Sequence, residues 1–306
     1  MLNRGHFLQC AWITAGRMFR LVQGLRYHEI DSPDKVYDSK EDSTCTEEKR
    51  RVFWMAYLLD HLFVMRNDWP VTLSEHMICT KLPVPDSDFQ GDCLVSGNFI
   101  SQAITDPASQ ANSPFNDCLA IVTLCGRGLL RNRHNNISKV YGDDNSDLSE
   151  HWRWLEDVLF LKDQIKSRGD TFHPLGTFAQ ILGQVAEILL CKGVIQKNSN
   201  YGQCMLDDCH RRISIATEEI IRLARGLTYL HFSQVCPLMS MPLFAAAEFL
   251  YEYRHLKDGA FLQQLQDLVD VLGKLRNQRV KKFIRYYDES GGWSIWNHLE
   301  LNIAKW

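Results

Sequence analysis

Several patterns that identify whole classes of protein are missing from this sequence of 306 residues. No uninterrupted apolar run reaches the roughly 18 to 20 residues that cross a bilayer, because the stretch from Val52 to Met65 is shorter and contains an acid. Residues 1–10 lack the layout of a signal peptide. Glycine-rich phosphate loops and nucleophile elbows are missing as well. We therefore expect an intracellular protein, in the nucleus or the cytoplasm, that does not enter a membrane.

The ten cysteines do not have the spacing of a metal site. Zinc modules need two closely spaced Cys or His ligands and then a second such pair. The nearest approach is Cys204, Cys209 and His210, which has no second pair. Two acids at 207–208 followed by two arginines at 211–212 indicate a salt-bridged helix start rather than a metal site. We expect reduced thiols and no zinc cluster of the kind that reads DNA.

The charge balance is unlike that of a nucleic-acid-binding domain. The formal net charge is −3, whereas phosphate binding needs a concentration of Lys and Arg. The densest basic stretch, from Arg276 to Arg285, places its charges at helical spacing, which a solvated helix face explains as well as a phosphate track does. We expect no direct contact with nucleic acid through this chain.

What the sequence does contain is helical periodicity from end to end. Strand-like alternation is absent, and apolar residues recur at steps of three and four. This periodicity predicts helices over His6–Tyr27, Thr44–Asn67, Asp117–Arg131, His151–Ser167, Thr171–Gly193, Met205–Thr228, Val235–Tyr253 and Phe261–Tyr287, with a short helix near Phe99–Ile104 and a polar linker over Asn132–Ser149. The predicted architecture is all-α, a single bundle-like domain over residues 1–306 with about eight to ten helices.

We expect the fold to be organised around residues 44–88. Thr44 and Glu47 have the spacing of a capping box at a helix start. The helix that follows is apolar on nearly every face from Val52 to Met65, which predicts burial on all sides. Asp60 interrupts it, and an unpaired buried carboxylate is costly. We therefore predict an ion pair between Asp60 and a basic residue of a neighbouring helix, with catalysis as the alternative.

The same stretch resembles the fungal-specific transcription factor domain, the middle homology region of fungal zinc-cluster activators. The matching residues are Glu48, Arg50, Arg51, Val52, Phe53, Trp54, Leu59, Asp60, Trp69, Pro70, Leu82 and Pro83. The likeness covers about the first 90 residues, and a proline followed by an alanine-rich helix at 236–250 is similar to the end of that domain. The resemblance implies a helical regulatory domain without a DNA-reading module of its own.

Such a domain would bind an apolar effector or a partner protein, and a homodimer is left open. The chain is rich in aromatic residues, with 8 Trp, 10 Tyr and 15 Phe, which form either an ordinary core or the lining of an apolar pocket. For a ligand pocket we predict the residues Trp54, Tyr57, Asp60, Phe63, Met239 and Phe244. No cofactor is expected in this interpretation.

An enzyme is the alternative hypothesis. Residues 143–147 match the DDxxD pattern with which class I terpene cyclases hold Mg²⁺ against a prenyl diphosphate, so Asp143, Asp144 and Asp147 would be its metal ligands. The chain would then be a magnesium-dependent sesquiterpene cyclase of secondary metabolism, with its catalytic residues unassigned. No second acidic motif follows, and a solvated loop with a helix cap explains these residues more simply. A truncated product without an independent role is the third hypothesis.

Overall fold

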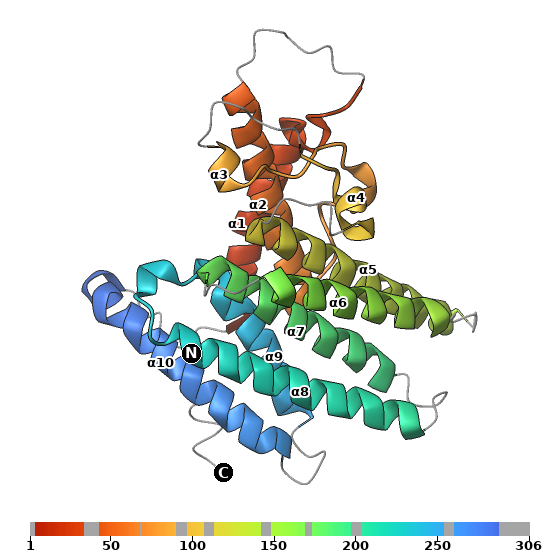
Figure 1. Ribbon diagram of the computed structural model, residues 1–306, viewed down its shortest axis with the longest axis vertical. Coiled ribbons are helices and arrows are strands. Elements are labelled where there is room, and N and C mark those ends of the chain that lie inside the picture. Colours follow the sequence, from red (N-terminus) through yellow and green to blue (C-terminus); the bar gives the residue numbers. More distant parts are fainter. Residues whose placement is uncertain are drawn as a thin grey trace.

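The computed structural model describes residues 4–33, 43–67, 69–89, 97–106, 113–141, 148–168, 173–196, 203–253 and 260–287. Within these ranges the regular elements are helices and no strand occurs, which confirms the all-α prediction (Figure 1). The α-helices are α1 (Arg4–Gly24), α2 (Ser43–Asn67), α3 (Asp86–Phe89), α4 (Ile100–Thr105), α5 (Pro114–Val140), α6 (Leu148–Arg168), α7 (Pro174–Ile195), α8 (Gln203–Leu227), α9 (Ser240–Glu252) and α10 (Ala260–Tyr287).

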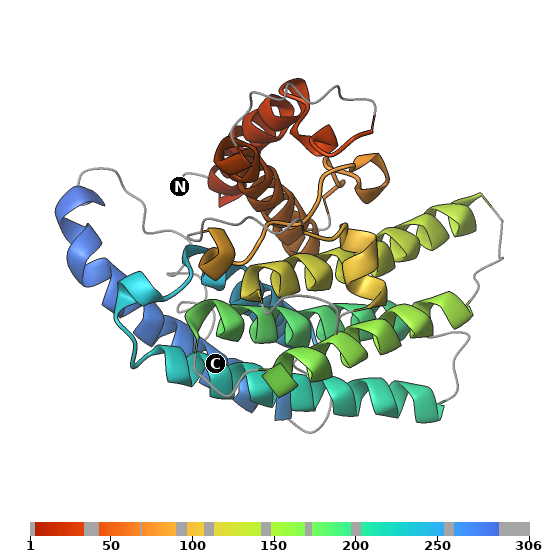
Figure 2. The ribbon, with the colours of Figure 1, turned by 45° about the horizontal axis from the view of Figure 1, so that its top comes forward.

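The helices form two groups that share one core. α1 and α2 pack against each other, and α2 also contacts α5 and α9. α5, α6, α7 and α8 lie alongside one another, with α2 placed against α5 and α1 packed on α2 (Figure 2). α9 and α10 pair and cover the remaining side. A single cluster of buried apolar side chains extends from α1 to α10.

α7 is the central helix of the second group. It contacts α5, α6, α8 and α9, and most of its side chains are buried. By length and composition α7 is apolar enough to cross a bilayer, and 78% of its most apolar 18-residue window is buried inside the protein. No uninterrupted apolar run of that length occurs in α7, because Gly, Thr, Gln, Glu187 and Lys192 interrupt it, yet its mean hydropathy stays within the range of a membrane-spanning segment. Within this fold α7 is a core helix.

Helix ends differ most from prediction in α5. The helix continues to Val140, so the first part of the predicted linker over Asn132–Ser149 is helical. Asn135, in that part, is only 4% exposed. The residues here are polar but have ordinary helix propensity, and packing decides the outcome.

Proline positions agree with the predicted helix starts. Pro174 opens α7, and His173 caps it by accepting a hydrogen bond from the Gly176 backbone N–H at 3.4 Å. Pro242 lies in the first turn of α9, where its missing N–H has no helical partner to lose. The basic stretch at 276–285 belongs to α10, but its side chains lie outside the described part of the chain.

Candidate functional site

The first turns of α2 hold a buried carboxylate that joins the helix to a distant segment. Glu47 is 1% exposed, and its Oε1 accepts a hydrogen bond from the Val84 backbone N–H at 2.9 Å. Glu47 also pairs with Arg50 at 3.4 Å and Arg51 at 3.3 Å. α2 begins at Ser43, one residue before the predicted start at Thr44. The capping box between Thr44 and Glu47 stays a prediction.

Residues 78–85, which we call the strap, run extended beside α2. Their backbone groups bond to the segment after α1, since Cys79 N–H donates to His28 O at 2.6 Å and Cys79 O accepts from Asp31 N–H at 2.9 Å. Side chains donate to the strap carbonyls as follows: Trp54 Nε1 to Lys81 O at 2.7 Å, Asn116 Nδ2 to Pro83 O at 2.9 Å and Arg51 Nη2 to Val84 O at 2.9 Å. Because buried backbone groups need partners, this network fixes the path of the strap.

Arg50 forms a bidentate ion pair with Asp31. Its Nη2 and Nε donate to the two carboxylate oxygens of Asp31 at 2.5 and 3.0 Å. The Lys81 backbone N–H donates to the same carboxylate at 2.8 Å. Burial alone would raise the pKa of Asp31, but the Arg50 guanidinium and the Lys81 amide outweigh it and hold that pKa below its ordinary value.

Asp60 is buried as predicted, but its partners differ from the prediction. The side chain is 1% exposed, and its Oδ2 accepts backbone N–H groups from Thr72 at 2.8 Å and Leu73 at 2.7 Å. The expected ion pair with a basic residue of a neighbouring helix is wrong, because among the described residues these amides are its hydrogen-bond donors. A charge-assisted bond to each amide attaches the loop after Pro70 to α2.

Tyr57 and His61 join α2 to α5. The Tyr57 hydroxyl hydrogen bonds with Thr123 Oγ1 at 3.0 Å, and burial raises the Tyr57 pKa. His61 Nδ1 lies 3.0 Å from Tyr57 O, and the two rings have centroids 3.9 Å apart. Burial lowers the His61 pKa despite the opposing charge of Asp60, so the ring is neutral at pH 7. Both side chains therefore act as packing groups between two helices.

The six residues predicted for a ligand pocket are all buried and come from two places. Trp54, Tyr57, Asp60 and Phe63 lie on α2, whereas Met239 and Phe244 lie at the start of α9 and the turn before it. Phe63 stacks on Trp69 with centroids 5.8 Å apart, and the Arg66 guanidinium lies 4.9 Å above the Phe244 ring. None of the six lines either of two clefts found among the described residues, of about 480 and 230 Å³. A pocket built from these residues stays a prediction.

The alternative metal ligands Asp143, Asp144 and Asp147 lie outside the described residues. Within the described residues, no group of three or more His, Cys, Asp or Glu side chains is arranged to hold a metal ion.

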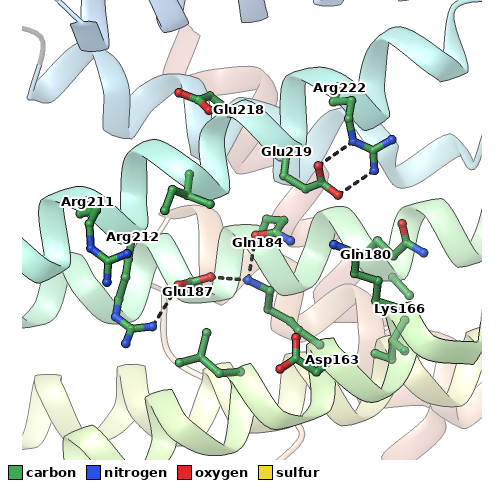
Figure 3. Close-up of a pocket in the computed structure, with 15 residues that line it drawn as sticks. Asp163, Lys166, Gln180, Gln184, Glu187, Arg211, Arg212, Glu218, Glu219 and Arg222 are labelled. Carbon is green, nitrogen blue, oxygen red and sulfur yellow. Dashed lines mark hydrogen bonds and ion pairs between the residues drawn. The ribbon is translucent and has the colours of Figure 1, made fainter.

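The larger cleft lies over α7, between α6 and α8 (Figure 3). Its polar floor is one face of α7, formed by Gln180, Gln184 and Glu187 at spacings of four and three residues. The walls are Leu159, Lys162, Asp163, Ile165 and Lys166 of α6 and Arg211, Arg212, Ile215, Glu218, Glu219 and Arg222 of α8. Its volume falls within the range of small-molecule sites, roughly 300 to 1,000 Å³.

A buried charge network crosses the floor of this cleft. Lys162 reaches over α7, donates from Nζ to Gln184 Oε1 at 2.8 Å and forms an ion pair with Glu187. Gly183 permits this crossing, since a Cβ there would lie 2.7 Å from Lys162 Cγ. Arg212 approaches Glu187 from α8 at 3.8 Å. Glu187, only 5% exposed, thus connects side chains from both walls.

The rim of the cleft is formed by ion pairs within α8. Asp208 accepts from Arg211 and Arg212 at 2.6 Å each, which confirms the predicted salt-bridged pattern. Arg222 donates to the two oxygens of Glu219 at 2.6 and 2.7 Å. The arginines lower the pKa values of both carboxyls, Arg212 most strongly for Asp208 and Arg222 for Glu219.

The lining of the cleft is made of polar, charged and aliphatic side chains. Among the described residues that line the cleft there is no Ser, Cys, His or Tyr. What it offers is amide, ammonium, guanidinium and carboxylate groups around a concave floor. Sequence reasoning missed this cleft, although a lone acid in the apolar face of α7, Glu187, is the same signal that singled out Asp60.

Comparison with known proteins identifies a family whose matched range includes the residues around the strap. Residues 3–142 match the model of the fungal specific transcription factor domain. That range contains α2, the strap and all of α5, and it ends before α6. The residues that carry the resemblance thus include Arg50, Arg51, Trp54 and Asp60, each of which fixes the strap or an adjoining loop. The large cleft lies beyond the matched range.

The chain is also similar to activators of fungal metabolite clusters. It is 45% identical over 278 residues to a citrinin biosynthesis transcriptional activator of Monascus purpureus, covering 89% of this chain and 48% of that protein. It is 35% identical over 291 residues to a pigment biosynthesis transcriptional activator of Monascus ruber, covering 91% and 52%. An ascochitine biosynthesis cluster transcriptional regulator of Didymella fabae is 33% identical over 306 residues, covering 89% and 53%.

The chain therefore spans about half the length of these relatives. No solved structure matches it significantly. The resemblance that the motif around Asp60 indicated is confirmed, and residues 3–142 of this chain are a fungal specific transcription factor domain.

Proposed function

We propose that this chain is the regulatory part of a transcriptional regulator of a fungal secondary-metabolite gene cluster, working in the nucleus. The observation that carries the proposal is the similarity over about nine tenths of the chain to three activators or regulators of such clusters. The similarity continues through α6, α7 and α8, so it includes the cleft as well as the matched domain.

We further propose that the chain acts by binding an effector or a partner protein rather than by reading DNA. The net charge of −3 supports this, and within the described part of the chain the cleft arginines pair with acids, whereas phosphate binding needs a concentration of unpaired Lys and Arg. The all-helical fold, with a concave polar site beside a rigid framework, suits a domain that receives a signal.

A reporter assay tests the regulatory role. The chain is fused to an unrelated DNA-binding domain whose site lies upstream of a reporter gene in a fungal host. We expect the fusion to change reporter output relative to the DNA-binding domain alone, and Asp60→Ala, which should detach the loop at Thr72 and Leu73 from α2, to abolish that change. Output equal to that of the DNA-binding domain alone, at equal protein level, would contradict the proposal.

A mobility-shift assay tests the second part. The purified chain is titrated into duplex DNA from cluster promoters at low salt. We expect no retarded band at micromolar protein, whereas a retarded band that weakens with added salt would show direct phosphate binding.

A further inference from the structure

One cation of the cleft over α7 makes no direct ion pair with the described residues. Lys166 lies one turn after Lys162 on α6 and lines the cleft. Its charge helps to lower the pKa of Glu219 across the cleft, but within the described part of the chain it forms no hydrogen bond or salt bridge. The other lining cations are held in place, Lys162 by Glu187, both Arg211 and Arg212 by Asp208, and Arg222 by Glu219. Lys166 is therefore the charge that can meet an incoming anion without breaking a pair.

Gln184 adds a donor of fixed direction beside this cation. Its Oε1 accepts from Lys162 Nζ at 2.8 Å, so its amide nitrogen must point away from Lys162. Figure 3 shows Gln180 and Lys166 on that side of Gln184. An ammonium and an amide N–H₂ thus face the same end of the cleft, which is a donor arrangement suited to a carboxylate.

An apolar wall adjoins these donors. Ile215 of α8 is 54% exposed and lines the cleft, opposite Leu159 of α6. A single exposed isoleucine needs no explanation on a convex surface. In a concave wall, however, its apolar area can be removed from water by an occupant, at about 25 cal/mol per Å².

We propose that this cleft binds a small organic acid, with the carboxylate at Lys166 and Gln184 and the apolar body against Ile215. The inference rests on the proposed function in one respect: in a regulator, the bound acid would be the effector. The binding step stands by itself and is tested separately, so a failure of binding and a failure of regulation are distinguishable.

Calorimetric titration of the purified chain with 2-naphthoate tests the binding step. Two further probes separate its parts, since 2-naphthamide keeps the apolar body without the charge and acetate keeps the charge without the body. We expect 2-naphthoate to bind about tenfold more tightly than 2-naphthamide, a difference of about 1.4 kcal/mol, and acetate to give no measurable heat. Equal affinities for the acid and the amide, or no heat with 2-naphthoate, would overturn the proposal.

Variants locate the binding within the cleft. Lys166→Met should weaken 2-naphthoate binding about tenfold and leave 2-naphthamide unaffected, whereas Lys166→Arg should retain binding of the acid. Ile215→Asn should weaken both naphthyl probes. The matched controls are Lys274→Met and Leu262→Asn, at exposed positions on α10, which should change nothing. Thermal unfolding of each variant verifies folding, and unchanged affinity in folded Lys166→Met would place the ligand elsewhere and contradict the inference.

Discussion

The strap region and the cleft over α7 handle charge in different ways. Around the strap, the carboxylates of Asp31, Glu47 and Asp60 are at most 3% exposed and accept backbone N–H groups from other segments. In the cleft, Glu187 and Glu219 pair with Lys and Arg side chains. A carboxylate bonded to backbone amides determines where the chain runs. Carboxylates that pair only with side chains leave the chain path to apolar packing.

The largest expected effect of this difference is at Asp60. Asp60→Ala leaves the amides of Thr72 and Leu73 buried without an acceptor, and we expect a loss of about 3 kcal/mol in the free energy of unfolding. Urea unfolding followed by circular dichroism measures it. Asp267→Ala, at a half-exposed acid of α10, is the matched control and should cost less than about 0.5 kcal/mol. Equal losses of unfolding free energy in Asp60→Ala and Asp267→Ala would mean that bonding to buried backbone N–H groups gives Asp60 no special role in stability.

A second substitution tests how tightly the strap is enclosed. A Cβ at Gly97 would lie 2.3 Å from the backbone oxygen of Leu82, so we expect Gly97→Ala to cost about 2 kcal/mol. In Gly16→Ala, by contrast, the new Cβ meets nothing within 4 Å, and higher helix propensity should stabilise the protein by up to about 1 kcal/mol. Opposite signs in urea unfolding are the expected result, and a neutral Gly97→Ala would show that the strap can move.

The Asp31 carboxyl makes the stability of the strap region depend on pH. Its pKa lies below the ordinary value of 3.8 in the folded protein, so its contribution to stability is present above that ordinary value and is lost as pH falls through the folded pKa. We expect Asp31→Asn to cost about 1.5 kcal/mol at pH 7. The difference from the unsubstituted protein should shrink below about pH 4. A difference that stays constant from pH 7 to pH 2 in urea unfolding would contradict this account.

The smallest effects are expected in the cleft. A double-mutant cycle with Lys162→Met and Glu187→Gln should give a coupling of about 1 kcal/mol, because this pair is largely buried. Arg222→Ala, which removes an exposed pair with Glu219, should change stability by less than about 0.5 kcal/mol. A cost of Arg222→Ala as large as that of Asp60→Ala would mean that the cleft, too, fixes the chain path.

The fold was largely predictable because apolar periodicity depends on local sequence. It placed the long helices near their observed positions and identified α2 as buried. The end of α5 was missed since residues 132–140 read as polar, and only contacts with other parts of the chain keep Asn135 buried.

The partners of the buried acids were not predictable in the same way. Burial of Asp60 followed from its apolar neighbours, but the backbone amides that satisfy it belong to Thr72 and Leu73, and an N–H group has no sequence signature. The cleft escaped prediction for a related reason. Lys162, Glu187 and Arg212 come from three helices, and their meeting depends on helix packing that periodicity does not specify.

Because α7 is the central helix of its group, the order in which the helices are synthesised determines how long α7 stays uncovered. Two of the helices that cover it, α8 and α9, leave the ribosome after it does. Until they arrive, the nascent chain presents a helix apolar enough to be taken for a membrane segment, a surface that chaperones and insertion machinery recognise. A product that stops between α7 and α8 would therefore keep the whole strap region and still be prone to aggregation.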